Sequence, residues 1–251
     1  MSTPKTPLYA YGLHAVQALL EQAPQRIRQL FLQHAAKEDR NQQTIVALAK
    51  AAGIAIQMQS RSTLDNLVEQ GVHQGVVAHL IATQQYDDTD LATLLDKLEQ
   101  PAFLLILDGV QDPHNLGACL RSANAAGVHA VIVPKDKSAP LTAVAYKAAS
   151  GAADVTPLIR VTNLARTMEK LKQRGIWLYG ASDSAQQPLY AADLKGSIAW
   201  VLGAEGDGLR RLTRDTCDAL YAIPMQGAVS SLNVSVATGI CLFEAVRQRA
   251  L

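Results

Sequence analysis

The spacing of apolar residues changes several times along the first 84 residues, between the period of a helix and the alternation of a half-buried strand. Ile54, Ile56 and Met58 show the strand pattern clearly, because smaller or polar residues separate them. In order, the predicted elements are a helix over 12–22, a strand over 29–33, a helix over 41–52, a strand over 54–58, a helix over 63–69 and a strand over 75–81. The amino-terminal third is therefore predicted to be a small α/β domain.

The region after residue 100 contains short apolar runs that alternate with helical patterns. The run over 103–107 carries no charged residue, as expected of a strand that is buried on both faces. The predicted strands are 103–107, 130–133, 155–159, 176–180, 198–202 and 220–223. Strands that alternate with helices indicate a parallel sheet covered on both faces. We therefore predict an α/β fold for the larger, carboxyl-terminal part as well.

An acidic segment separates the two parts. It begins with the sequence QQYDDTD over 84–90, and residues 85–100 carry one basic against five acidic residues, a net charge of −4. Residues 1–84 carry seven basic against five acidic residues, and residues 101–251 carry fifteen against twelve, so these parts have net charges of +2 and +3. We predict a substrate-binding domain over 1–84, an acidic linker over 85–100 that includes a short helix near 91–98, and a second domain over 101–251.

Composition narrows the class of protein. Apolar residues make up 49% of the 251 residues and charged residues 18%, which is typical of globular proteins. No apolar run reaches the length of about 18 residues that suggests a membrane span, and Met1–Pro7 has no apolar signal-peptide core. Cys119, Cys217 and Cys241 lack the spacing of a zinc site, so no metal site and no membrane partner are predicted. An odd number of cysteines favours reduced thiols and a cytoplasmic location.

Three segments carry unusual combinations of glycine and polar residues. The first, DGVQDPHNLGACLRSAN over 108–124, follows the first predicted strand of the larger domain. Asp112 followed by Pro113 is typical of a helix N-cap and first turn. On that helix Asn115 lies in the first turn, and Arg121 lies on a neighbouring face less than two turns away. Both are expected near the carboxyl ends of the strands, where open α/β sheets bind ligands.

The second segment, VLGAEGDGLR over 201–210, is predicted to run from a strand through a Gly-rich loop into a helix. Three glycines in six residues let backbone N–H groups approach a ligand closely. Their order differs from the GxGxxG of dinucleotide-binding sites, and the Lys and Ser/Thr of a phosphate-binding loop are missing. Glu205 and Asp207 would repel a pyrophosphate, so an adenosine-bearing ligand that is cationic at its reactive end fits this loop better.

The third segment, AIPMQGAVSSLNVSVATGI, covers residues 222–240. A buried strand is expected to end at Pro224, which has no N–H to donate, and Gly227 allows a tight turn. Ser230 or Ser231 is expected to cap the helix that follows. The apolar positions with helical spacing on that helix are Leu232, Val236, Ile240 and Phe243. The N–H groups at such a helix start, beside polar side chains, form a site for a charged or dipolar ligand.

Together, these segments resemble the signature motifs of the SPOUT class of RNA methyltransferases, in the branch that methylates ribose 2′-hydroxyls. The matching patterns are NxxxxxR in the first segment, GxEGxGL in the second and IPMxGxxxSLNVSVAxGI in the third. The resemblance covers about 103–249. The sequences YGLHAV over 11–16 and VHQGV over 72–76 resemble hallmarks of the substrate-binding domain in members that modify ribosomal RNA guanosine.

The resemblance implies features that periodicity cannot show. The carboxyl-terminal domain would be a parallel-sheet SPOUT domain whose last segment forms a trefoil knot, which is a rare topology. The amino-terminal domain would be a small α/β RNA-binding domain of the L30e-like type. Members of the family work as homodimers, with the site near the subunit interface.

The activity that the resemblance implies is methyl transfer from S-adenosylmethionine to the ribose 2′-hydroxyl of a guanosine in 23S ribosomal RNA, in the peptidyl-transferase region. A transfer-RNA ribose methyltransferase is an alternative, because it shares the three motifs but usually recognises its substrate through different extensions. A non-catalytic RNA-binding module that retains the fold is a second alternative, against which the complete motif set speaks. A nicotinamide-dependent enzyme is the general α/β alternative, which the glycine order disfavours.

The resemblance also implies two sets of site residues. Contacts to the methyl donor, mostly through the main chain, are expected at Gly203, Ile223, Leu232 and Met225. The catalytic set is expected to be Arg121, Asn115, Glu205, Ser231 and Asn233. His114 and His73 receive no catalytic role, because one is a motif residue without an assigned function and the other belongs to the amino-terminal domain.

Arg121 is expected to act on the 2′-hydroxyl, which is chemically unusual because a guanidinium keeps its proton far above neutral pH. A nearby RNA phosphate could help Arg121 to lose that proton, or Arg121 could hold a phosphate and the hydroxyl in line while another group accepts the proton. Asn115 would orient Arg121 or the ribose, since an amide both donates and accepts. Glu205 would fix the Gly-rich loop or pair with Arg121. Purely structural alternatives are a surface ion pair for Arg121, a helix-start carboxylate for Glu205 and an N-cap for Ser231.

Overall fold

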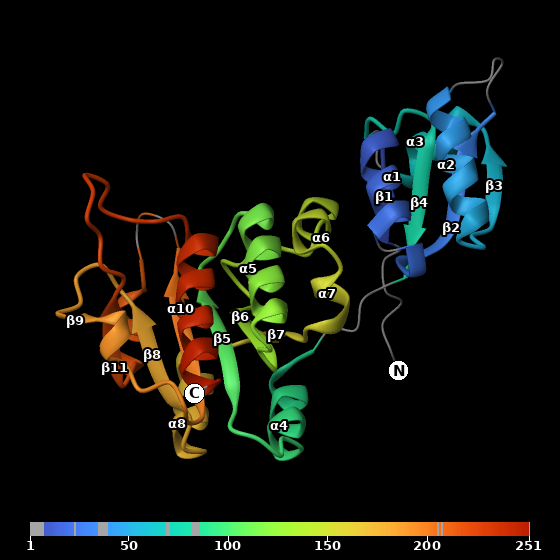
Figure 1. The fold of residues 1–251 in the computed structure, drawn as a ribbon. Coiled ribbons are helices and arrows are strands. Elements are labelled where there is room, and N and C mark those ends of the chain that lie inside the picture. The colour runs from blue at the N-terminus through green and yellow to red at the C-terminus, as the bar shows by residue number, and fades with distance from the viewer. Residues whose placement is uncertain are drawn as a thin grey trace. The chain divides into compact units, whose positions relative to one another are not determined.

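The computed structural model describes residues 8–22, 24–34, 40–68, 71–81, 86–204, 206 and 208–250. The chain divides into two compact units, Met1–Gln84 and Gln85–Leu251. Each unit has its own sheet (Figure 1) and its own hydrophobic core.

The amino-terminal unit contains a four-stranded sheet in the order β1-β4-β2-β3. Strands β1 and β2 are antiparallel to β4, and β3 is parallel to β2. The strands are β1 (Leu8–Tyr11), β2 (Ile27–Gln33), β3 (Ile56–Gln59) and β4 (Val76–Leu80), and the helices are α1 (Leu13–Gln22), α2 (Arg40–Ala51) and α3 (Arg61–Leu67), with a 3-10 turn at Pro24–Arg26.

Alternation along β2 divides the apolar residues of this unit between the two faces of the sheet. Leu30 and Leu32 pack in the core that α1 and α2 cover, whereas Phe31 packs with Leu64 of α3 on the other face. This arrangement confirms the predicted α/β domain. Strand β1 was not predicted, because four residues are too few to show a clear alternation.

The larger unit contains a seven-stranded parallel sheet in the order β7-β6-β5-β10-β8-β11-β9. The strands are β5 (Phe103–Asp108), β6 (Ala130–Pro134), β7 (Leu158–Val161), β8 (Trp177–Ala181), β9 (Gln187–Pro188), β10 (Ile198–Gly203) and β11 (Ala219–Ala222). All six residues of β5 are buried, the uncharged apolar run over 103–107 as predicted and Asp108 in addition.

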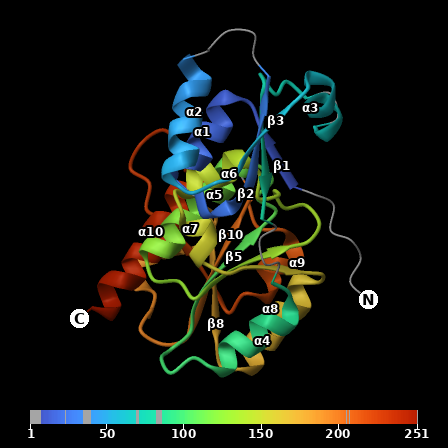
Figure 2. The same ribbon diagram turned by 90° about the vertical axis from the view of Figure 1, so that its right-hand side faces the viewer.

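Helices cover both faces of this sheet. They are α4 (Asp88–Asp96), α5 (Pro113–Ala125), α6 (Ala143–Ala149), α7 (Ala152–Val155), α8 (Leu164–Gln173), α9 (Arg211–Thr216) and α10 (Val234–Arg249), with a 3-10 turn at Leu189–Ala191. Figure 2 shows α5, α7 and α10 on one side of the strands and α4, α8 and α9 on the other. Leu105 and Leu107 of β5 face the first layer, and Leu104 and Ile106 face the second. The fold class is α/β, as predicted.

The segment over 85–100 is more than a linker. It contains α4, whose Leu91 is buried in the core of the larger unit. Its acidic residues have a structural reason: Asp87 caps α4 and forms a capping box with Asp90. Carboxylates at a helix start also offset the positive end of the helix dipole.

Other elements of the larger unit also differ from the prediction, and β9 was not predicted. Residues 152–155 form the short helix α7, so β7 begins at Leu158 and not at Val155. Strand β11 ends at Ala222, two residues before Pro224. No helix in the described ranges is long and apolar enough to cross a bilayer.

Candidate functional site

A pocket of about 510 Å³ lies at the carboxyl ends of β8, β10 and β11 and the start of α10. All four residues predicted to contact the methyl donor line it, namely Gly203, Ile223, Met225 and Leu232. Ser231 and Asn233, from the predicted catalytic set, line the same pocket. The second and third sequence segments therefore meet in one cavity.

Gly203 must be a glycine at its position at the end of β10. A Cβ atom there would overlap the backbone of Gly208 and of Leu209, because the Gly-rich loop folds back against the strand end. Ala204 and Gly208 form an isolated bridge, in which the Gly208 N–H donates to the Ala204 carbonyl at 3.1 Å. Gly206 and Gly208 have φ values of +84° and +62°, a region that favours glycine. The loop therefore presents mostly backbone to the pocket.

Helix α10 begins later than its sequence suggested. Asn233 is the N-cap, and its Oδ1 accepts the Ser235 N–H at 2.9 Å and the Ser235 Oγ–H at 2.6 Å. The prediction that Ser230 or Ser231 caps this helix is wrong, because Asn233 supplies the capping oxygen. Ser231 lies in the preceding loop, where it lines the pocket. Ser231 therefore does not cap α10.

Asn115 connects the first segment to this region. Asp112 caps α5 by accepting the Asn115 N–H at 2.9 Å, as predicted. The Oδ1 of Asn115 accepts a hydrogen bond from Asn233 Nδ2 at 3.1 Å, and Asn115 is buried. The two predicted catalytic amides thus lie side by side, one at the start of α5 and one at the start of α10.

Arg121 lies on a different side of α5. It is one turn from Gly117, where an added Cβ would overlap the Ala145 carbonyl of α6, so this stripe of α5 faces α6. Arg121 itself is exposed, and it is not among the residues that line the pocket. Arg121 is six residues after Asn115, so the two side chains point about 120° apart around the helix axis. The structure therefore joins Asn115 to Asn233, which lines the pocket together with Ser231, and leaves Arg121 apart from this group.

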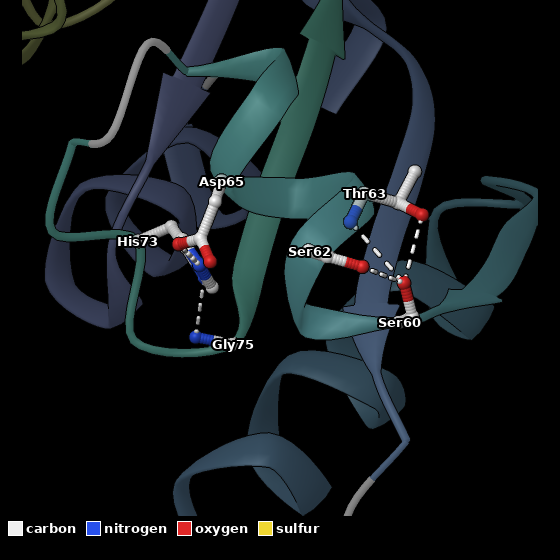
Figure 3. A network of polar contacts seen from close by, with 6 residues as sticks. All are labelled: Ser60, Ser62, Thr63, Asp65, His73 and Gly75. Atoms are coloured by element: carbon white, nitrogen blue, oxygen red, sulfur yellow. Dashed lines mark hydrogen bonds and ion pairs between the residues drawn. The ribbon is translucent and has the colours of Figure 1, made fainter.

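The remaining candidates have simpler outcomes. Glu205 lies outside the described residues. His114 is exposed on the first turn of α5. His73 belongs to the amino-terminal unit, where its Nε2 is 2.9 Å from Asp65 Oδ1 and its Nδ1 accepts the Gly75 N–H at 2.9 Å (Figure 3). Because Nδ1 accepts, the proton of this buried imidazole is on Nε2, which faces Asp65. The hydrogen bond from the Gly75 N–H holds the turn in the VHQGV sequence, which is a structural role for His73.

An ion pair at the edge of the site was not predicted. Asp108, the last residue of β5, is buried, and both of its carboxylate oxygens accept from Arg210. Arg210 Nε donates to Oδ1 at 2.6 Å, Nη2 pairs with the same oxygen, and the backbone N–H donates to Oδ2 at 3.2 Å. The only signal in the sequence was an acidic residue directly after an uncharged strand.

Two charged residues of the pocket lining were also missed. Asp183 follows β8 and Arg214 lies on α9, and both line the pocket. A carboxylate and a guanidinium complement the ammonium and carboxylate groups of an amino acid. S-Adenosylmethionine carries such a group beside its sulfonium and adenosine. A backbone-lined cavity with this charge pair therefore fits that donor.

Two family models match the chain. Residues 102–243 match the model described as the SpoU rRNA methylase family. The chain belongs to the SpoU rRNA methylase family. Residues 9–86 match the model described as RNA 2′-O ribose methyltransferase substrate binding. The two matches correspond to the two compact units and confirm the resemblance that the sequence motifs indicated.

Curated relatives of this SpoU methylase extend over nearly its whole length. It is 58% identical over 241 residues to the 23S rRNA (guanosine-2′-O-)-methyltransferase RlmB of Yersinia pestis, which covers 96% of this chain and 97% of that protein. It is 57% identical over 240 residues to the same-named enzyme of Escherichia coli K12, with 96% and 98% of the two chains covered. The crystal structure of the SpoU methyltransferase AviRb from Streptomyces viridochromogenes, in complex with AdoMet, has the same fold, with a TM-score of 0.69, 23% identity and 98% and 91% of the two chains covered.

Proposed function

We propose that this chain transfers a methyl group from S-adenosylmethionine to the ribose 2′-hydroxyl of a guanosine in 23S ribosomal RNA. The observation that carries this proposal is the pocket at the carboxyl edge of the parallel sheet, which all four expected donor contacts line. The near full-length identity to enzymes named for this reaction supports the choice of RNA and nucleotide.

The donor would be held mainly by backbone. Gly203 and its loop form one wall of the pocket, and the loop from Ile223 to Leu232 forms another. Asp183 and Arg214 would bind the amino-acid end of the donor, whose sulfonium supplies an already activated methyl group. Because the methyl group is activated, the protein's main task is orientation, which can contribute about 7–11 kcal/mol when two reacting groups are well aligned.

The residues on the acceptor side would orient the ribose. With its Oδ1 bonded to Asn233, Asn115 can use its Nδ2 to donate to a ribose or phosphate oxygen. Ser231 lines the donor pocket, as Asn233 does, and would position the hydroxyl. Arg121 would bind the phosphate next to the target ribose and hold the 2′-hydroxyl in line, since a guanidinium binds phosphate through two parallel hydrogen bonds. Glu205 would fix the Gly-rich loop or pair with Arg121.

The active form would be a homodimer. Val236 and Phe243, from the apolar stripe of α10, are 50% and 49% exposed in the single chain, and the buried face of α10 is a different one. An apolar helix face of this kind favours a partner surface, and a second copy near α10 could bring its own Arg121 to the pocket. Phe243→Glu should then shift the protein from dimer to monomer in light scattering. We also propose the carboxyl-terminal trefoil knot and a cytoplasmic location, which the family membership supports.

The substrate is tested by methyl transfer in vitro followed by mapping. The purified protein, S-adenosylmethionine and deproteinised 23S rRNA should give one new 2′-O-methylguanosine in the peptidyl-transferase region, located by nuclease digestion and mass spectrometry. Methylation of transfer RNA in preference to 23S rRNA would instead support the transfer-RNA alternative. Donor binding without methylation of either RNA would favour the non-catalytic alternative.

A further inference from the structure

Asp108 is a buried carboxylate at the edge of the site to which the proposed reaction gives no role. Its side chain has no exposed surface, and it is the last residue of β5. A buried charge is costly unless a partner of opposite sign and hydrogen bonds compensate it. The groups that donate to the Asp108 carboxylate therefore indicate its structural role.

All three N–H groups described on Asp108 come from one residue, Arg210. Two belong to the guanidinium and one to the backbone, and together they reach both carboxylate oxygens. Arg210 directly follows the Gly-rich loop and precedes α9. The carboxylate thus fixes both the side chain and the backbone at the end of that loop.

The beginning of the loop is attached to the same residue. Strands β5 and β10 are parallel, and the last pair in their register is Gly203 with Asp108. The Gly-rich loop thus begins at Gly203, which lies beside Asp108 in the sheet, and it ends at Arg210, which binds the Asp108 carboxylate. Between these points, Gly203, Ala204, Gly206, Gly208 and Leu209 line the pocket. The loop is therefore closed at its base by one carboxylate.

We infer that Asp108 and Arg210 are positioning residues for the methyl donor, because their ion pair closes the base of the Gly-rich loop and sets how its backbone lines the donor pocket. This inference rests on the proposed function, in which that pocket binds S-adenosylmethionine. Asp108 is also where the chain leaves β5 toward α5, whose first turn carries Asn115. The Asp108 carboxylate thus fixes the Gly-rich loop of the donor pocket, and Asp108 itself ends β5, the strand that precedes α5 and its Asn115.

Two single variants change the ion pair with little change in volume. Arg210→Lys keeps the positive charge but removes the planar fork of donors. Asp108→Asn places an amide that donates where a second acceptor is needed. Arg211→Gln is the matched control, because Arg211 is the next residue, its side chain is 96% exposed, and it pairs only loosely with Asp215 at 3.7 Å.

The experiment measures kcat, the donor KM and the RNA KM of each full-length variant, donor affinity by calorimetry, and thermal unfolding. In Arg210→Lys we expect the donor KM and Kd to rise about ten- to hundredfold, since a displacement near 1 Å has effects of this size. The kcat at saturating donor and the RNA KM of Arg210→Lys should stay within about threefold of the unaltered protein. For the control Arg211→Gln, kcat, both KM values and the donor Kd should stay within about twofold of the unaltered protein. The double variant Asp108→Asn/Arg210→Lys should raise the donor KM no further than the worse of its two single variants, because both changes break one interaction.

Three results would overturn the inference. The first is a donor KM within about twofold of the unaltered protein in folded Arg210→Lys and in the double variant. The second is a fall in kcat with unchanged donor KM, which indicates loss of folded enzyme. The third is loss of the cooperative unfolding transition in both variants, which assigns the pair to the core. If the unaltered protein does not bind S-adenosylmethionine, the proposed function fails before these comparisons begin.

Discussion

The two halves of the candidate site differ in how completely one chain builds them. On the donor side, residues from β8, β10, α9 and the loop before α10 line one pocket, and all four residues expected to contact the donor are among them. On the acceptor side, Asn115 and Asn233 are joined, but Arg121 is exposed on the side of α5 that faces α6. Under the proposed function, the donor half is ready before RNA binds, whereas the RNA and the second copy of the proposed homodimer complete the acceptor half.

The largest effect is expected at Arg121. Arg121→Ala should lower methyl transfer by about 10³-fold or more, because orientation of the hydroxyl and its proton transfer are both lost. Donor affinity should stay unchanged, since Arg121 does not line the pocket. Arg121→Lys should fail similarly, because lysine lacks the planar fork. Single-turnover rates and calorimetry measure the two quantities, and turnover within about tenfold of the unaltered protein would refute the role of Arg121.

The converse effect is expected at Gly203. Gly203→Ala places a Cβ in the backbone of Gly208 and Leu209, so the loop must move and the donor pocket change shape. Donor affinity should fall about hundredfold, while RNA affinity stays within about twofold. Gly196→Ala is the matched control, because no atom lies within 4 Å of its added Cβ. Equal donor affinity of the two variants would show that the Gly-rich loop is not a wall of the donor site.

A smaller effect is expected from removal of the amino-terminal unit. The larger unit has its own sheet and core, so a chain that lacks residues 1–84 should still bind the donor with an affinity within about twofold. Its affinity for 23S rRNA should fall about tenfold or more, with a shallower dependence on salt, because phosphate contacts are lost. Filter binding at several salt concentrations measures this. Unchanged RNA affinity would place all recognition in the methyltransferase unit.

The smallest effect concerns the far end of α10, the helix whose start carries Asn233. Hydrogen bonds from Arg247 and Gln248 lower the pKa of Glu244 from its ordinary value of 4.5 to about 2. A lowered folded-state pKa stabilises the fold above pH 4.5, and this contribution disappears as the pH falls from 4.5 toward 2. Glu244→Gln should remove about 1 kcal/mol of this pH-dependent stability. Denaturant unfolding at pH 7 and pH 3 checks this, and equal losses at both pH values would contradict it.

The sequence predicted the donor half of the site better than the acceptor half for a physical reason. Gly203, Ile223 and Leu232 were expected from the resemblance of two segments to the SPOUT motifs, and they line one cavity because strand ends and loops place them there. The start of α10 was misjudged, because Ser230, Ser231 and Asn233 are all good N-caps and only the packing of α10 decides among them. The Asp108–Arg210 pair could not be predicted, because 102 residues separate its members and the order of the strands brings them together.

The most direct test is a crystal structure with a non-reactive analogue of S-adenosylmethionine and a guanosine-containing RNA fragment. The account predicts the analogue in the pocket lined by Gly203 and Leu232, with the position of its methyl group about 3–3.5 Å from the ribose 2′-oxygen. It further predicts that the Arg121 guanidinium, from the same chain or from a second copy, contacts that oxygen or the adjoining phosphate. An analogue bound elsewhere, or a ribose that neither Arg121 approaches, would contradict it.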